Sequence, residues 1–203
     1  MESELQKRGL VSLELTSPIW ERFYMASPLV IVGTLEEDGA PDLAPKHMVT
    51  PLGWDNYVGF VCSPSHATYL NAVRNGEFTL SFPRPGGVIS ASMAAAPRCG
   101  EDHKPSLDLL ETFQATQVRG PLVADCYLHL ECTLHGTWDV FGLNSLVAGS
   151  VVAAHVSEDG VRRPDRDDGE VVAEEPLLVY LPPGRYARVS DTQAFPFHRG
   201  MKL

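Results

Sequence analysis

The chain has 203 residues, 44% of them hydrophobic and 21% charged, and this ordinary composition excludes a disordered, collagen-like or coiled-coil protein. Lysine and arginine together number 16 against 26 acidic residues, which gives a formal net charge of -10 at pH 7. That charge argues against binding to nucleic acid or anionic membranes, but it permits a small anion in one locally basic pocket. The length favours one domain over residues 1–203.

The chain also predicts a cytoplasmic location and reduced thiols. Its first residues lack the basic-then-apolar order of a signal peptide, and no run of about 18 apolar residues predicts a membrane span. Four cysteines are too few in a chain of this length for a disulfide scaffold.

The first part of the chain predicts a β-meander. Ser17-Pro18 is typical of a helix start, and we expect a short helix ending near Met25. The Glu37-Asp38-Gly39 turn then predicts a hairpin, because it separates two strand-like segments. The strands predicted in this part cover residues 29–35, 42–50 and 57–62.

The rest of the chain mixes strands with short helices. Ala67, Leu70 and Val73 predict a helix over 66–74, which the Asn75-Gly76 pair would end with a left-handed cap. Further helices are expected at Met93 and at 106–114, and further strands at 78–82, 126–140, 147–156 and 177–180. Residues 157–175 hold eight acidic residues and three arginines, a net charge of -5, and we expect an exposed hairpin or loop there.

Cys126, His129, Cys132 and His135 lie three residues apart, which raises the hypothesis of a zinc site. Side chains alternate between the two faces of a strand, so Cys132 would share a face with leucines while His129 and His135 share the other. We therefore expect no metal and interpret the cysteines as small core residues. The G-x-S-x-G turn of hydrolases and the glycine-rich loops that hold nucleotide phosphates are both missing from the sequence.

The segment 63–71 is rich in hydroxyl groups and runs from a predicted strand into a predicted helix. Free N–H groups and the helix dipole at such a start favour an anion, and Ser63, Ser65 and Thr68 can add hydroxyl donors. The alternative is that Ser63 or Ser65 only caps the helix.

Two cationic residues, Lys46 and His47, lie on the preceding hairpin. A three-stranded meander can bring them beside the same helix start. The alternatives are an ordinary exposed lysine and a surface histidine.

In their order along the chain, these segments resemble the flavin reductase-like, FMN-binding split-barrel family, for which flavoredoxin is a representative. Members have an Asn-x-Ala-Pro-x-Ser-like stretch, then Lys-x-Thr-x-x-Asn opening a helix, then Gly-x-Phe. The matching stretches here are Asp42-Leu43-Ala44-Pro45-Lys46-His47, His66-Ala67-Thr68-Tyr69-Leu70-Asn71 and Gly76-Glu77-Phe78. Later landmarks are Pro121, Glu131-Cys132, a turn-to-strand at Gly149-Ser150-Val151-Val152, and Gly184-Arg185-Tyr186, so the resemblance covers roughly residues 25–190.

The resemblance implies a mainly β, Greek-key split barrel with a few short helices, assembled as a homodimer that binds one FMN per subunit near the interface. By position, Ser63, His66, Thr68 and Asn71 would surround the phosphate. Lys46, His47 and Met48 would line the ring and ribityl chain, and the isoalloxazine would lie along residues 44–49. Backbone N–H groups between His47 and Val49 would stabilise the reduced flavin. The cofactor-binding residues expected are thus Lys46, His47, Met48, Val49, Ser63, Ser65, His66, Thr68 and Asn71.

The function implied is that of an FMN-dependent oxidoreductase, supplied with electrons by NAD(P)H or by a redox protein. One alternative is a non-catalytic flavin-binding electron carrier. Another is a split barrel for a different phosphorylated cofactor, because pyridoxamine phosphate oxidases share the general shape. The chain departs from the family pattern twice: His66 replaces a lysine, and Gly142-Leu143-Asn144 stands where NAD(P)H-using members often have Gly-Asp-His.

Overall fold

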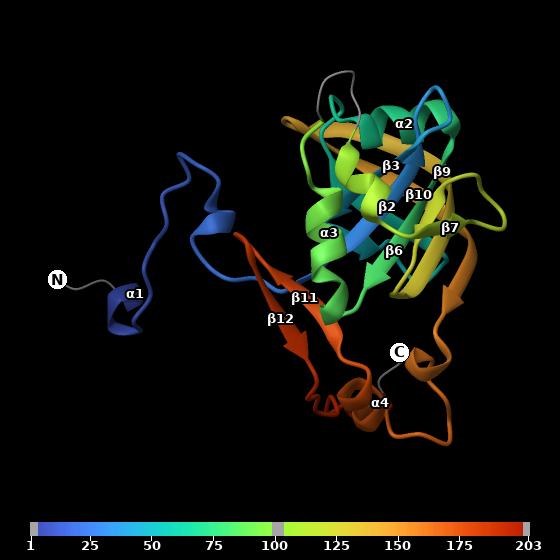
Figure 1. Ribbon diagram of the computed structural model, residues 1–203. Helices are drawn as coiled ribbons and strands as arrows, with labels where there is room; N and C mark the ends of the chain where they lie inside the picture. The colour runs from blue at the N-terminus through green and yellow to red at the C-terminus, as the bar shows by residue number, and fades with distance from the viewer. Residues whose placement is uncertain (1–3, 99–103, 201–203) are drawn as a thin grey trace.

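The computed structural model describes residues 4–98 and 104–200. Strands account for 39% of it, which confirms the predicted mainly β class. The main sheet contains β2 (Val30–Leu35), β3 (Pro41–Lys46), β4 (Val49–Pro51), β5 (Tyr57–Cys62), β6 (Glu77–Pro83), β9 (Cys126–Phe141) and β10 (Asn144–Val156). These seven strands pair antiparallel in the order β3-β2-β6-β9-β10-β5-β4, and the sheet curls into a half-barrel (Figure 1).

The two edge strands of this sheet, β3 and β4, follow one another in the chain. Only His47 and Met48 separate them, so the sheet must curl until its edges approach. The sequence predicted one continuous strand over 42–50; the break at these two residues is where the chain passes from one edge to the other.

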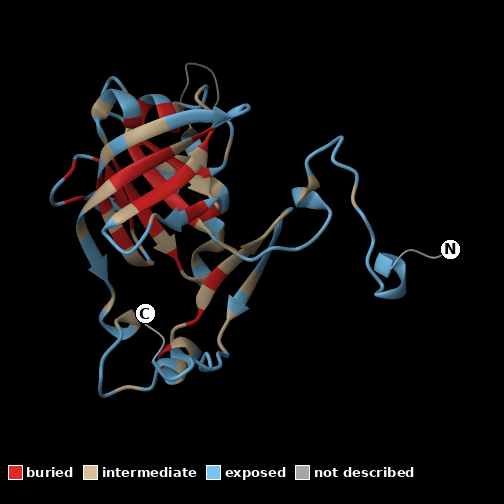
Figure 2. Cartoon of the chain, turned by 180° about the vertical axis from the view of Figure 1, so that it is seen from behind, coloured by how far each residue is buried: buried red, intermediate tan, exposed pale blue. Residues whose placement is uncertain are grey.

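The curled sheet encloses the main hydrophobic core, and buried residues concentrate there (Figure 2). Val30, Phe60 and Phe78 are fully buried on its inner face. Ile31 and Leu43 point to the outer face, where they pack against α3 (Val88–Ala94) in a second cluster. Because β2 is covered on both faces, its sequence is a nearly continuous apolar run and does not alternate with polar residues.

The helix α2 (Ala67–Asn75) confirms the prediction for residues 66–74, and Gly76 ends it in the left-handed conformation, at φ 69°. A small second sheet holds β1 (Ser27–Pro28), β11 (Leu177–Leu181) and β12 (Arg185–Val189), and a third pairs β7 (Thr112–Gln114) with β8 (Pro121–Val123). Short 3-10 turns lie at η1 (Ile19–Glu21), η2 (Pro85–Gly87), η3 (Pro105–Leu109) and η4 (Glu158–Gly160).

Several expectations for the irregular parts are wrong. The helix expected at 106–114 is a 3-10 turn followed by β7, and the one ending near Met25 is only the three-residue turn η1. The Gly149–Val152 landmark is no turn, because it lies inside β10 with Ser150 opposite Thr133. Tertiary contacts decide these segments, whose sequences have little periodicity of their own.

The acidic segment 157–175 is more ordered than the loop expected there. It contains η4 and the helix α4 (Asp168–Glu174), which Asp167 caps by accepting the N–H groups of Gly169 and Glu170. Asp168 pairs with Arg162, and Glu174 with Arg166. Two of the eight acidic residues are therefore paired within the segment.

The alternation predicted for 126–135 is confirmed around Cys132, which packs in the inner core while His129 contacts Ser81 and Phe113 on the outer face. No group of three or more potential metal ligands lies together within residues 4–98 and 104–200. The thiols of Cys62, Cys126 and Cys132 are free, whereas Cys99 falls outside the described residues.

The N-terminal residues form an arm that leaves the barrel (Figure 1). It begins with α1 (Glu4–Lys7), which buries no residue, and it exposes Leu10, Val11 and Leu15. None of the described helices is long and apolar enough to cross a membrane.

Candidate functional site

A groove of about 440 Å³ lies where the two sheet edges approach each other. Its wall is the chain reversal from His47 to Thr50, and its floor comes from β5 and β10. The residues that line it are Trp20, Met25, Ala26, Ser27, Pro28, His47, Met48, Val49, Thr50, Gly59, Val61, Leu146 and Pro182. This size lies within the range of small-molecule and cofactor sites.

The groove offers polar backbone and an unused hydroxyl group. β4 is an edge strand and is paired on one side only, and its residues Val49 and Thr50 line the groove, so outward backbone groups are available to a ligand. The Ser27 hydroxyl is buried and has no hydrogen-bond partner among the described residues. A buried polar atom without a partner is costly, so a bound molecule that pairs with Ser27 would be favoured.

The floor of the groove requires Gly59. A Cβ atom at this position would lie 2.9 Å from a methyl carbon of Leu146 and 3.0 Å from one of Leu52. A side chain here would push Leu146 into the groove. The absence of a side chain at Gly59 therefore keeps space open above the floor of the groove.

His47 closes one end of the groove against the small second sheet. Its ring centroid lies 4.9 Å from that of Tyr180 on β11. Burial, together with the positive charge of Lys46, lowers the pKa of His47 below its ordinary value. The imidazole is therefore neutral at pH 7 and can donate and accept a hydrogen bond.

Lys46 ends β3, and its side chain interacts with Cys62 at the end of β5. Burial raises the pKa of the Cys62 thiol, and the adjacent Lys46 ammonium group opposes that rise. The Cys62 sulfur also lies 4.0 Å from Nδ1 of His66. The fold thus joins the end of β3, the end of β5 and the start of α2, as the meander predicted.

The two serines before α2 do not cap it. The residue preceding the helix is His66, which makes no side-chain cap, and the Ser63 and Ser65 hydroxyls lie 2.9 Å from each other. The first N–H groups of a helix have no partner in a preceding turn. This start is therefore able to receive an anion, and its hydroxyl groups lie beside it.

The remaining residues expected at the site differ in their surroundings. Thr68 is buried, and Asn71 is engaged inside the protein: its amide donates to Thr34 Oγ1 at 3.3 Å and accepts from Arg74 at 2.7 Å. Met48 is 45% exposed at the mouth of the groove, whereas the Val49 side chain packs in the main core.

The sequence did not indicate several lining residues, among them Trp20, Ser27, Leu146 and Pro182. They come from four separate segments, and no local pattern connects them. One available signal was Gly59 inside a predicted strand, since such a glycine often marks a close approach.

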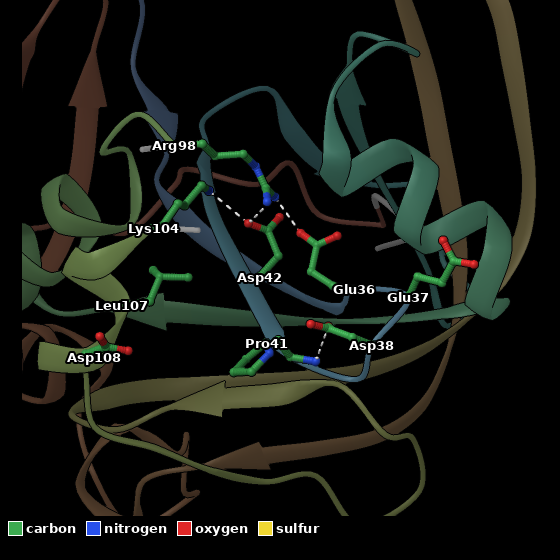
Figure 3. A pocket seen from close by; sticks show the side chains of 10 residues that line it. Glu36, Glu37, Asp38, Pro41, Asp42, Arg98, Lys104, Leu107 and Asp108 are labelled. Carbon is green, nitrogen blue, oxygen red and sulfur yellow. Dashed lines mark hydrogen bonds and ion pairs between the residues drawn. The ribbon is translucent and has the colours of Figure 1, made fainter. Parts of the chain in front are cut away.

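A separate pocket of about 460 Å³ lies by the turn between β2 and β3 (Figure 3). Arg98 and Lys104 point toward Asp42, whose Oδ1 lies 3.0 and 2.9 Å from them, and Arg98 also pairs with Glu36. Glu37, Asp38 and Asp108 line it too, so its carboxylates outnumber its cations. That field disfavours a phosphate-bearing ligand here.

Comparison with known proteins places this geometry in a family. A model of the flavin reductase like domain matches residues 22–189. The chain belongs to the flavin reductase-like family. The match includes β1 to β12 and leaves out most of the N-terminal arm, in agreement with the resemblance drawn from the motifs.

Solved structures of other proteins share the fold. Flavoredoxin from Methanosarcina acetivorans has a TM-score of 0.75 at 22% identity, over 94% of this chain and 96% of its own. Nitrilotriacetate monooxygenase component B from Bacillus cereus has a TM-score of 0.77 at 17% identity, over 92% and 98%. An FMN-binding protein from Thermus thermophilus has a TM-score of 0.74 at 21% identity, over 91% and 99%. The predicted split barrel is confirmed.

Proposed function

We propose that this member of the flavin reductase-like family binds FMN in the groove between β1, β5 and the His47–Thr50 reversal, and that it acts as an oxidoreductase. The observation that carries the proposal is that β5 connects the two regions: Gly59 and Val61 line the groove, and the strand ends at Cys62, beside Lys46 and His66. FMN combines a planar ring with a phosphate, and an apolar groove and a helix start with nearby cations are the two environments that such a molecule needs.

The residues present fit such a cofactor. The unpartnered Ser27 hydroxyl and the low floor at Gly59 provide a polar contact and room for a ring. Ser63, Ser65 and His66 offer donors for a phosphate, and Lys46 offers a positive charge. Asn71 and Thr68, on the buried side of α2, would hold that helix in place. Bound FMN would supply electron transfer, while the protein binds and orients it.

The purified chain, reconstituted with FMN and then desalted, should be yellow and show a bound-flavin absorbance spectrum. Chromatography of the released cofactor should identify FMN. A colourless protein that retains no FMN would contradict the proposal, and retention of pyridoxal phosphate instead would support another phosphorylated cofactor.

Lys46→Met tests the placement of the phosphate. It removes one charge-assisted contact, so FMN affinity should fall roughly 10-fold, measured by fluorescence quenching. Arg163→Met, in the exposed segment after β10, is the control and should leave affinity unchanged. Equal FMN affinity of both variants would show that Lys46 does not contact the phosphate.

An electron carrier is the second candidate, and the hairpin tip favours it. Gly142 and Leu143 form a tight turn between β9 and β10, and Leu143 is 87% exposed, without the charged groups of the Gly-Asp-His segment. Stopped-flow reduction of the reconstituted protein distinguishes the two. Rapid reduction by NADH or NADPH would support a reductase, and reduction only by a redox protein would support a carrier.

We further propose that the protein acts as a homodimer and that the N-terminal arm of each copy lies against the other. The support is the exposure of Val11 at 84% and Leu15 at 81% on an arm that leaves its own barrel. Exposed apolar side chains on a contiguous segment are typical of an interaction surface. The cytoplasmic location of the protein stays a prediction.

A further inference from the structure

A third cavity, a pocket of about 360 Å³, shares His47 with the groove. It is enclosed between β3, α3 and the turn that joins β11 to β12. His47 lines both cavities, and its ring contacts that of Tyr180, which lines this pocket. At this volume it suits a small molecule of about one ring.

The wall of this pocket is apolar and aromatic. Leu29, Val88 and Ala91 supply its aliphatic side, and Tyr180 and Tyr186 supply two aromatic rings. His47 adds a third ring, neutral because burial and Lys46 lower its pKa. Such a wall favours a flat, apolar body over a sugar or a polyol.

One charged group stands at this pocket. Arg185 lines it, and no acidic side chain does so among the described residues. Within the part of the chain that the structure describes, Arg185 has no ion-pair partner, although the protein carries a net charge of -10. A free guanidinium beside an apolar wall is a fork-shaped donor suited to a carboxylate.

The turn that carries Arg185 is held in place. The N–H group of Gly184 donates to the Tyr180 hydroxyl at 2.9 Å, and Gly184 takes a φ of 78°. The same tyrosine therefore packs on His47 and fixes the residue next to Arg185. This contact holds the backbone of the turn from which the Arg185 side chain extends.

We propose that this pocket binds a small aromatic carboxylate, its ring between Tyr180, Tyr186 and α3 and its carboxylate on Arg185. The site is separate from the groove and does not depend on a bound flavin. The chemistry is recognition only: Arg185 pairs with the anion and the apolar wall takes the ring.

Titration calorimetry of the full chain with benzoate tests the proposal, with and without FMN present. Benzoate should bind in both cases, and benzamide, which has the same shape but no charge, should bind roughly 10-fold more weakly. Arg185→Gln should weaken benzoate binding by roughly 10- to 100-fold. Arg188→Gln is the matched control, because Arg188 lines a different pocket with Arg84, and it should change binding less than about 2-fold.

Ala95→Leu provides an independent variant. Ala95 is exposed at the end of α3 and lines the pocket, so a larger side chain fills the space without disturbing the core. It should weaken benzoate binding while leaving the unfolding temperature unchanged. Absence of benzoate binding to the wild type, equal binding by Arg185→Gln, or loss of binding on adding FMN would each overturn the proposal.

Discussion

At the scale of single residues, Glu131 shows a buried charge held by several partners. It is fully buried on the outer face of β9, and its two carboxylate oxygens accept the N–H groups of Thr116, Gln117 and Val118. His155 lies 2.9 Å from it. Burial alone would raise the pKa of Glu131, but these donors outweigh burial and lower the pKa to about 2.

Glu131→Gln should lower the free energy of unfolding by about 2–3 kcal/mol at pH 7, because an amide offers fewer acceptor sites to the same donors. Urea unfolding measures this. Glu174→Gln, at an exposed pair with Arg166, is the control and should cost less than about 1 kcal/mol.

The difference between wild type and Glu131→Gln should also depend on pH. The folded pKa is depressed, so below the ordinary value of 4.5 the unfolded chain binds the proton first. The stabilisation by Glu131 is thus fully present above about pH 4.5 and is lost as the pH falls through about 2. If wild type and Glu131→Gln differed by the same free energy of unfolding at pH 3 and at pH 7, the charge of Glu131 would not be responsible for the difference.

At the scale of elements, the start of α2 and the side of α2 that packs on β2 have different roles. Its start lies beside Lys46 and Cys62, whereas its side packs on β2 through Asn71, Thr34 and the buried Ala72. Arg74 and Asn75 extend this attachment by donating to the carbonyl of Leu35. A helix fixed in this way presents its N–H groups in one orientation.

Asn71→Ala tests whether the attachment of α2 to β2 is independent of FMN binding. Loss of the two amide hydrogen bonds should lower the free energy of unfolding by about 1–2 kcal/mol. FMN affinity of the folded protein should change less than about 2-fold by fluorescence titration. A large loss of affinity without loss of stability would instead support the phosphate contact that the family resemblance implies for Asn71.

At the scale of the whole molecule, the barrel carries two attachments: the N-terminal arm, which is mostly exposed, and the small sheet of β1, β11 and β12, in which β11 is intermediate to buried (Figure 2). The small sheet still contributes to the proposed sites, since Ser27 lines the groove and Tyr180 packs on His47. The arm has no such contact between α1 and η1, which is the reason for assigning it to a second copy.

Deletion of residues 1–17 should convert the proposed dimer to a monomer or weaken it strongly, because Leu10, Val11 and Leu15 are removed together. Light scattering after size exclusion measures the mass. Val11→Asp with Leu15→Asp should have the same effect, and Glu14→Gln, at an exposed polar position of the same arm, should not. Dimers of unchanged stability after the deletion would assign the interface to the barrel.

Local pattern determined much of this protein. The β-branched runs defined β2 and β5, helical spacing with Asn75-Gly76 defined α2, and alternation separated Cys132 from His129. The order of short motifs also indicated the family, because each motif corresponds to a turn or a helix start whose chemistry is written in a few neighbouring residues.

Tertiary structure decided what the two sheet edges bring together. The groove joins Ser27, His47, Gly59 and Leu146, and the pocket at Arg185 joins α3 to the turn after β11, across segments that no periodicity connects. The reason is the curl of the sheet: β3 and β4 are neighbours in the chain but opposite edges in space. Sequence patterns report which face of a strand is buried, whereas closure of the barrel sets which distant faces meet.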